Sequence, residues 1–162
     1  MAREMKIKNL PPDYISGLID GEGCFALKFR RDVRHKRKNK PIYFYWDIEF
    51  AILLKATDRE ILEAIQKTFN CGSISQSKRE HVRYSISNMD DLKEKLVPFL
   101  EKYPLRANKR FDFNLWKKAL TLLHKNKGKR RNLWELSDTE NLERIQKEMG
   151  RHKGSNRTWK WL

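Results

Sequence analysis

One carboxylate stands between two glycines at the predicted end of a short apolar helix. The helix begins after a Pro-Pro pair and runs to about Asp20, and Gly21, Glu22 and Gly23 follow it. If two such helices lie side by side, their Glu22 carboxylates repel each other unless a positive charge lies beside them. Carboxylate oxygens are the ligands that Mg²⁺ and Ca²⁺ prefer. The pattern therefore indicates a metal-dependent reaction; the alternative is an ordinary helix end with glycines as caps.

The same helix carries two glycines on one face. Residues four apart in a helix lie above one another, so Gly17 and Gly21 leave a groove that another backbone can approach closely. The spacing predicts a contact with a second copy of this helix or with a close relative of it. The expected contact residues are Ser16, Gly17, Asp20 and Gly21.

The composition predicts a polyanionic partner. Lys and Arg number 36 against 21 Asp and Glu, so the formal net charge of the 162 residues is +15. Such a balance suits DNA, RNA or an anionic membrane surface. No apolar run reaches about 18 residues and no signal peptide is recognisable, so we expect nucleic acid and no membrane partner. The length suits one domain over 1–162, with a core at about 11–124 and a basic helical extension at about 125–162.

The cysteines give no metal framework. Cys24 and Cys71 lie far apart, without a C-x-x-C pair, and the histidines are scattered in basic surroundings. We expect both cysteines to be packing residues in a reducing, intracellular compartment, either the cytoplasm or an organelle.

Two strands flank the most basic segment of the chain. From Cys24 the pattern alternates, which predicts a half-buried strand, and a second strand covers about 42–54. Seven of the twelve residues 30–41 are Lys or Arg. This segment is expected to be a loop that contacts phosphates, or otherwise a solvated loop.

Acids lie on the outward face of the second strand. Asp47 and Glu49 could accept hydrogen bonds from cytosine N4 in a DNA groove. Alternatively, they could pair with Lys28 and Arg30 across the sheet. The sequence alone favours neither reading.

The remaining pattern completes an α+β domain. It predicts a helix capped by Thr57 or Asp58 that ends at Asn70-Cys71-Gly72, strands over 73–77 and 81–87, and helices over 89–98, 106–124 and 137–149, the last capped by Ser137 or Asp138. The expected architecture is a four-stranded antiparallel sheet with helices on one face. A twisted ribbon with a polar open face can enter the major groove of DNA.

The segment Ile-Ser-Gly-Leu-Ile-Asp-Gly-Glu-Gly, residues 15–23, resembles the LAGLIDADG signature of homing endonucleases position by position. Residues 96–100 and 103–109 resemble the region that these proteins carry after the fourth strand. The resemblance implies an αββαββα fold whose sheet forms a DNA-binding saddle. Members with one motif work as homodimers, so a homodimer with the motif helices at its interface is implied.

The resemblance also implies a set of chemical roles. Glu22 and the carbonyl of Gly21 would hold the metal, and Asp20 would be structural. The implied cofactor is Mg²⁺, which Mn²⁺ could replace, whereas Ca²⁺ could bind without supporting cleavage. The basic residue that stabilises charge on the phosphate in this family aligns with Tyr103, so we prefer the adjacent Lys102, with Lys109 following in the next helix.

DNA contacts are expected from outward-facing side chains of the sheet and from basic segments. The candidates for reading sequence are Lys28, Arg30, Tyr45, Asp47, Glu49, Ser73, Ser75, Ser77, Arg83 and Ser85. The candidates for contacting phosphates, or bases near the ends of the site, are Arg34, Lys36, Arg37, Lys38, Lys129, Arg130 and Arg131. Phosphate contacts position a protein on DNA without specifying sequence.

The leading hypothesis is a site-specific double-strand DNA endonuclease with a long, partly palindromic target and short 3′ overhangs. No splicing domain flanks the motif, which favours an intron-encoded protein over an intein. The alternative is an RNA-binding maturase that assists splicing of its intron RNA, because a basic surface does not distinguish the two. A third reading, a DNA-binding regulator without cleavage, is disfavoured by the presence of Glu22.

Overall fold

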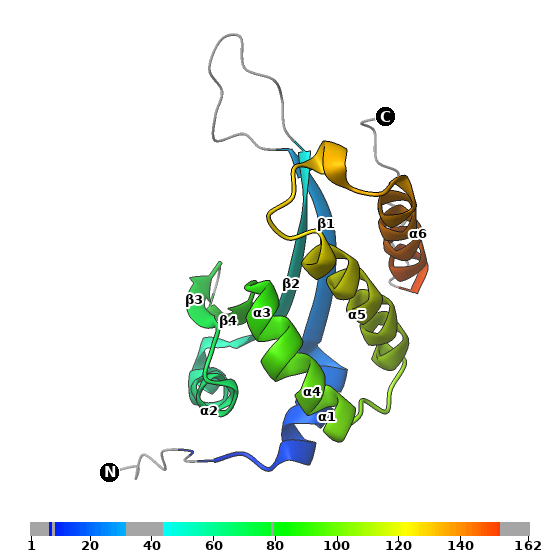
Figure 1. Cartoon of the computed structure of the whole chain (residues 1–162). Coiled ribbons are helices and arrows are strands. Elements are labelled where there is room, and N and C mark those ends of the chain that lie inside the picture. The colour runs from blue at the N-terminus through cyan, green and yellow to red at the C-terminus, as the bar shows by residue number, and fades with distance from the viewer. Residues whose placement is uncertain (1–6, 8, 32–43, 79, 153–162) are drawn as a thin grey trace, which may run out of the picture. The chain divides into compact units, whose positions relative to one another are not determined.

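A computed structural model describes residues 7, 9–31, 44–78 and 80–152. Their main elements are α1 (Pro12–Glu22), β1 (Gly23–Arg31), β2 (Phe44–Lys55), α2 (Arg59–Phe69), β3 (Ser73–Ser77), β4 (His81–Ile86), α3 (Met89–Asp91), α4 (Val97–Lys102), α5 (Lys109–Lys125) and α6 (Leu136–His152) (Figure 1). Three short turns complete the order: η1 (Ala56–Asp58) and η3 (Arg131–Leu133) are 3₁₀-helical, and η2 (Leu92–Leu96) is π-helical.

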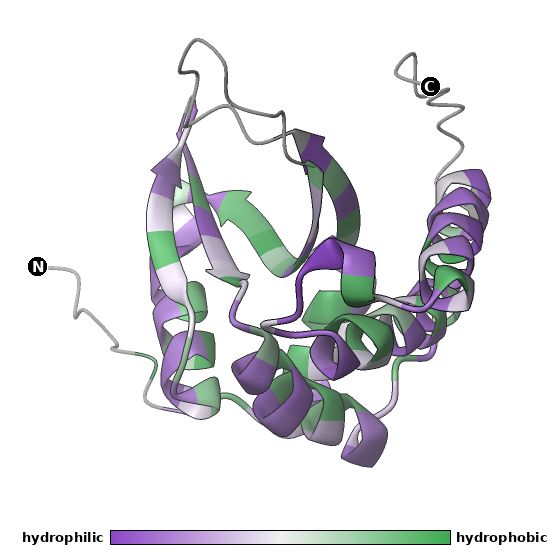
Figure 2. Ribbon diagram, turned by 45° about the horizontal axis from the view of Figure 1, so that its top comes forward, coloured by the Kyte–Doolittle hydropathy of each residue, from purple (hydrophilic) through white to green (hydrophobic). Residues whose placement is uncertain are grey.

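The four strands form one sheet in the order β1-β2-β4-β3. Strand β4 pairs antiparallel with both β2 and β3. The predicted α+β architecture with a four-stranded antiparallel sheet is therefore confirmed. Buried and half-buried residues alternate along β4, and the strands carry both hydrophobic and hydrophilic residues (Figure 2), as in a sheet with one buried and one open face.

By their internal contacts the residues form two compact units. Unit 1 comprises Met1–Phe25 and Glu49–Arg110, and unit 2 comprises Ala26–Ile48 and Phe111–Leu162. The divisions fall inside β1, β2 and the first turn of α5. The prediction of a single domain with a core and an extension stays a prediction.

The core of unit 1 lies between α2 and the β3–β4 hairpin. Leu62 and Ile65 on α2 and Val82 and Tyr84 on β4 are fully buried, and α2 contacts both strands. Each fully buried aliphatic side chain of this kind contributes roughly 1.5–3 kcal/mol. The helical spacing of apolar residues predicts this face of α2 correctly.

The two ends of α2 differ from the prediction. Asp58 precedes the helix but makes no side-chain cap bond. At the other end Asn70, with φ 52, takes the left-handed conformation that was expected of a glycine. Gly72, with φ 83, serves another purpose: a Cβ there would lie 2.6 Å from the Tyr84 ring. The glycine allows close packing and does not cap the helix.

Two later helices have shifted boundaries. The helix predicted over 89–98 continues to Lys102. Pro98 has no N–H to donate and would interrupt a regular α-helix. The π-helical turn just before it widens the helix and so accommodates the proline. The long helix predicted from residue 106 begins at Lys109, because the backbone N–H groups of Arg106 and Ala107 donate to a side chain elsewhere in unit 1.

In unit 2, α5 and α6 are fastened to the backbone of β1. The Trp116 indole N–H donates to the Ala26 carbonyl at 3.2 Å, and the Gln146 amide donates to the Leu27 carbonyl at 3.2 Å. Trp116 is fully buried, so its N–H needs such a partner.

Asp138 lies inside α6 and is not its cap. Its side chain is 6% exposed. The carboxylate accepts a hydrogen bond from the Asn126 amide at 2.9 Å and pairs with the Lys125 ammonium at 3.1 Å. The acid that the sequence assigns to a cap instead joins the end of α5 to the start of α6.

We expect Asp138→Asn to destabilise the protein at pH 7 and much less in acid. The hydrogen bond from Asn126, followed by the interaction with Lys125, lowers the pKa of the Asp138 carboxyl. The stabilisation is therefore complete above the unfolded pKa of about 4 and is lost as the pH falls through the lower folded pKa. Urea midpoints of wild type and variant should differ at pH 7 and converge below about pH 4. Glu143→Gln, at an exposed position of α6, is the control; a gap for Asp138→Asn that does not change with pH would contradict the assignment.

Candidate functional site

Helix α1 ends at Glu22 because the next residue leaves helical geometry. Gly23 has φ −70 and ψ 148, and its N–H donates to the Ile19 carbonyl. A Cβ on Gly23 would lie 2.7 Å from the Ile19 carbonyl oxygen, so only glycine fits this close approach. The helix is two residues longer than predicted, and Glu22 is its last residue, with an exposed side chain.

The two motif glycines leave an open strip on α1. Both Gly17 and Gly21 are exposed, and a Cβ added at either would meet no atom within 4 Å. Ile15 and Ile19, on the opposite face, are fully buried. Packing among the described residues therefore does not require glycine at positions 17 and 21.

The buried side of α1 is fastened to the segment that precedes α5, within unit 1. The Ser16 hydroxyl donates to the Tyr103 carbonyl at 2.7 Å. The Asp20 carboxylate accepts from the backbone N–H groups of Arg106, at 2.8 Å, and Ala107, at 3.2 Å. Both carboxylate oxygens of Asp20 are thus used, which supports the structural role given to it by the family resemblance. Ser16 and Asp20, expected at a dimer contact, make these contacts within the chain.

These bonds also bear on the choice of lysine. The bonded pairs are separated by 86 or 87 residues in sequence, so the segment runs alongside α1 in the same direction. Lys109, the first residue of α5, follows Ala107 by two residues, as Glu22 follows Asp20 by two. Lys102 comes earlier, at the exposed end of α4, with its ammonium 5.5 Å from the Tyr103 ring centroid. Sequence reasoning preferred Lys102 because nothing in the sequence reveals this register.

The open face of the sheet in unit 1 carries three rows of directly opposed residues. They are Ala51, Ser85 and Ser73; Leu53, Arg83 and Ser75; and Lys55, His81 and Ser77. The predicted DNA-contact residues Ser73, Ser75, Ser77, Arg83 and Ser85 therefore share one face. Glu49 joins them through an ion pair with Arg83, Nη1 to Oε1 at 2.7 Å. Leu53 also lies exposed on this face; it was not among the predicted contact residues, which are nearly all polar or charged.

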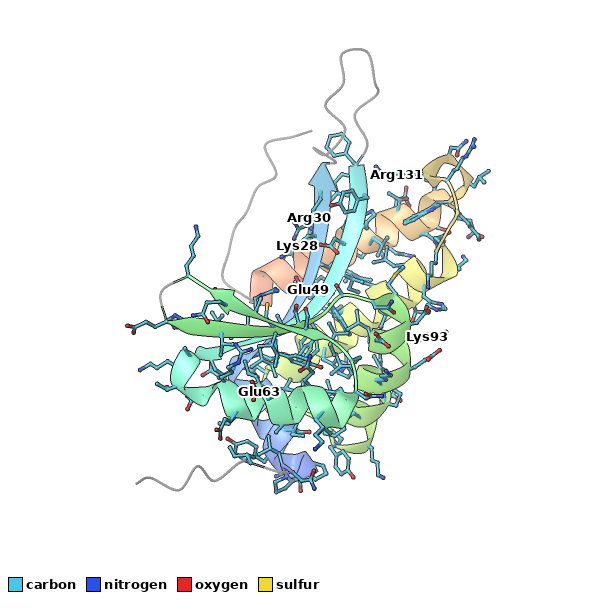
Figure 3. All side chains as sticks on the ribbon, turned by 90° about the vertical axis from the view of Figure 1, so that its left-hand side faces the viewer. Lys28, Arg30, Glu49, Glu63, Lys93 and Arg131 are labelled. Atoms are coloured by element: carbon cyan, nitrogen blue, oxygen red, sulfur yellow. The ribbon has the colours of Figure 1, made fainter. Side chains whose placement is uncertain are left out.

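Unit 2 holds the predicted contacts of β1 and the first half of β2. Arg30 pairs with Asp47 at 3.0 Å (Figure 3), which is the cross-strand pairing considered from sequence. Lys28 is half-buried and Tyr45 is 38% exposed. Arg34, Lys36, Arg37 and Lys38 lie outside the described residues.

Arg131 occupies a different environment from its neighbours in sequence. Its guanidinium lies 4.7 Å from the centroid of the Phe29 ring and donates to the Phe44 carbonyl at 3.3 Å. Phe29 in turn stacks on Phe44 with a centroid distance of 5.5 Å. Arg131 therefore braces the ends of β1 and β2, although it is exposed like Lys129 and Arg130.

The described residues contain no group of three acidic, histidine or cysteine side chains that could hold a metal. Glu22 nevertheless fits a hard divalent cation, because its carboxylate is exposed at a helix end where backbone carbonyls lack intrahelical partners. One carboxylate and one carbonyl are too few ligands for Mg²⁺. Other ligands would come from outside the chain.

The comparisons identify the family. The LAGLIDADG endonuclease family model matches residues 15–120, and the chain belongs to this family. It is 33% identical over 122 residues to probable intron-encoded endonuclease 2 of Neurospora crassa (73% of this chain and 25% of that protein). It is 33% identical over 110 residues to probable intron-encoded DNA endonuclease 1 of Mycosarcoma maydis (68% and 34%).

Two solved structures extend the likeness to the fold. The homing endonuclease I-TnaI superposes with a TM-score of 0.73 at 28% identity, over 87% of this chain and 88% of that chain. The LAGLIDADG meganuclease I-AabMI, bound to uncleaved DNA, superposes with a TM-score of 0.64 at 32% identity, over 76% and 40%. The chain spans a quarter to a third of the length of the two relatives compared by sequence. Among the described residues, no helix is long and apolar enough to cross a membrane.

Replacing Asp20 should destabilise unit 1. Asp20→Ala leaves two backbone N–H donors without their acceptor and should cost about 1–3 kcal/mol in the free energy of unfolding. Asp20→Asn keeps one acceptor oxygen and should cost less. Urea denaturation measures both. Full stability of Asp20→Ala would contradict the structural role.

Proposed function

We propose that this protein is a site-specific double-strand DNA endonuclease of the homing type, encoded within an intron. The observation that carries the proposal is the end of α1: an exposed carboxylate at Glu22 beside the glycine strip of the family motif. The net charge of +15 and the polar open face of the sheet support a DNA partner. The names of the relatives point to the same activity.

The chemistry requires few groups from the chain. Glu22 and the Gly21 carbonyl would hold Mg²⁺, with Mn²⁺ as a possible substitute. When bound, the metal supplies Lewis-acid activation of water and of the scissile phosphate. A lysine ammonium near the same phosphate stabilises the negative charge that grows on its oxygens during attack. Lys109 is the better candidate for this role by its register with α1, and Lys102 remains the candidate by sequence. The expected products carry short 3′ overhangs.

A homodimer follows from the incompleteness of the site. One Glu22 per chain is a poor metal site, and α1 has a strip that a second helix backbone can approach. Two copies packed through Gly17 and Gly21 would bring two Glu22 carboxylates together. The resulting two-fold symmetry predicts a partly palindromic target. No observation favours the RNA maturase, so it remains an outcome of the tests below.

Glu22→Gln should abolish cleavage and preserve DNA binding. The change removes the charge that would hold the metal but little volume, and the side chain is exposed, so the fold should persist. The assay is Mg²⁺-dependent cleavage of fragmented genomic or randomised DNA, with sequencing of the new ends. Lys109→Ala should lower the cleavage rate more than Lys102→Ala does. If Glu22→Gln still cleaves DNA, Glu22 is not the metal ligand. If the wild type binds RNA tightly and gives no recurrent DNA cuts, the maturase function is favoured.

Gly17→Leu should convert a dimer into a monomer. No atom lies within 4 Å of the position that a Cβ would take, so the subunit itself should keep its fold and gain roughly 1 kcal/mol of helix propensity. Sedimentation of wild type, Gly17→Ala and Gly17→Leu at equal concentration gives the test. The expected order of dimer strength is wild type, then Ala, then Leu. An undiminished Gly17→Leu dimer would show that α1 is not the contact.

A further inference from the structure

The middle row of the open sheet face in unit 1 is chemically unlike its neighbours. Arg83, on the inner strand β4, lies directly opposite Leu53 on β2 and Ser75 on β3. Leu53 is 43% exposed, which is unusual for a large apolar residue surrounded by serine and basic side chains. Directly opposed side chains of this kind have Cβ atoms about 4.5–5.5 Å apart. The Arg83 guanidinium extends from there along the sheet to Glu49, which precedes Leu53 by four residues on β2, so the face carries an apolar group and a cationic group at successive levels.

Glu49 forms an ion pair with Arg83. The contact joins Arg83 Nη1 to Glu49 Oε1 at 2.7 Å, and the Glu49 side chain is 13% exposed against 34% for Arg83. The hydrogen bond with Glu49 raises the pKa of Arg83. A guanidinium has five N–H donors in a planar fork, so one contact fixes its orientation while other donors remain for a second acceptor.

A second ion pair in unit 1 provides a contrast with the covered Glu49. Arg59 and Glu63 on α2 form a pair at 2.9 Å in which the two side chains are 48% and 52% exposed. Glu49 and Glu63 lie on opposite sides of the β3–β4 hairpin (Figure 3). The Arg59–Glu63 pair is an ordinary surface contact of little energetic value. In the Arg83–Glu49 pair the acid is covered and the arginine is presented.

We propose that Arg83 reads a guanine in the DNA target, that Leu53 contacts the methyl group of a thymine in a neighbouring base pair, and that Glu49 is a positioning residue for Arg83. Arginine is the usual bidentate partner of guanine O6 and N7 in the major groove, and apolar side chains contact the thymine methyl. Base pairs are about 3.4 Å apart along a strand, so two side chains at successive levels of one sheet face can reach base pairs within a few steps of each other. The proposal rests on the proposed function and gives it a base preference.

This assignment differs from the direct role expected for Glu49 from sequence. An acid that accepts from cytosine N4 must present its oxygens to the groove, whereas the Glu49 side chain is largely covered and one oxygen pairs with Arg83. Ion pairing and base reading are therefore divided between two residues. Glu49 acts on DNA only through the geometry of Arg83.

The experiment is a binding selection from a randomised duplex library in Ca²⁺, followed by sequencing and by titration of the recovered duplex. Wild type should enrich a guanine and a neighbouring thymine at one place in each half-site. Arg83→Ala should lose the guanine preference and bind the recovered duplex roughly 10- to 100-fold more weakly. Arg83→Lys keeps the charge but not the fork, so it should also lose the preference. Arg59→Ala, which removes the same charge from the other side of the hairpin, should leave the base profile unchanged.

Leu53 and Glu49 have their own readouts. Replacing the selected thymine by uracil deletes only the methyl group and should weaken wild-type binding about fourfold, the value of one buried carbon, whereas Leu53→Ser should bind both duplexes equally. Glu49→Ala should weaken the guanine preference, and Glu49→Gln, which keeps an acceptor oxygen, should restore it.

Three outcomes overturn the proposal separately from the proposed function. A recovered target whose base profile is unchanged in Arg83→Ala would make Arg83 a phosphate contact. Loss of a cytosine preference in Glu49→Ala, at a position that Arg83→Ala leaves alone, would make Glu49 a direct reader. If the replacement of thymine by uracil weakens binding of wild type and of Leu53→Ser equally, Leu53 does not contact the thymine methyl group. Recovery of no sequence at all would instead count against the proposed function.

Discussion

The Asp20 carboxylate is the point on which the candidate site depends. It accepts two backbone N–H groups from the segment before α5 and so fixes that segment against the end of α1. Ser16 adds a third bond in the same register. Without these bonds the acid at Glu22 and the lysine at 109 would belong to elements with independent positions. Asp20, the other acid of the motif, thus fixes the segment before α5 and has both of its oxygens occupied.

Two acids of β2 form ion pairs with arginines of the sheet. Glu49 pairs with Arg83 in unit 1, and Asp47 pairs with Arg30 in unit 2. A sheet face that carried only cations would repel itself and leave its long side chains in many conformations. Each acid lowers the local positive charge somewhat and in return limits the conformations of one arginine. This ordering has most value for an arginine that must meet a base edge, because bidentate geometry tolerates little misalignment.

Much of the fold follows from sequence pattern. Alternation in β1 and β2 and helical spacing in α2 predict these elements, because burial of one face determines both. The misassignments concern contacts between distant residues: Gly72 packs against Tyr84 while Asn70 ends α2, and Asp138 binds Asn126 instead of capping α6. For the site, Glu22 is recognisable from its motif, but the register that favours Lys109 and the exposure of Leu53 depend on tertiary packing that no local pattern encodes.

The glycine strip of α1 has a consequence for how such a protein can evolve. In the proposed homodimer, a contact surface made of backbone and hydrogen atoms holds few side chains that could distinguish one partner from another. Two copies that diverged after gene duplication would keep the strip and so could still associate, whether as separate chains or joined by a linker. Their sheets would then be free to change independently. Departure from a symmetrical DNA sequence thus requires no redesign of the helix pair, only drift on the strands.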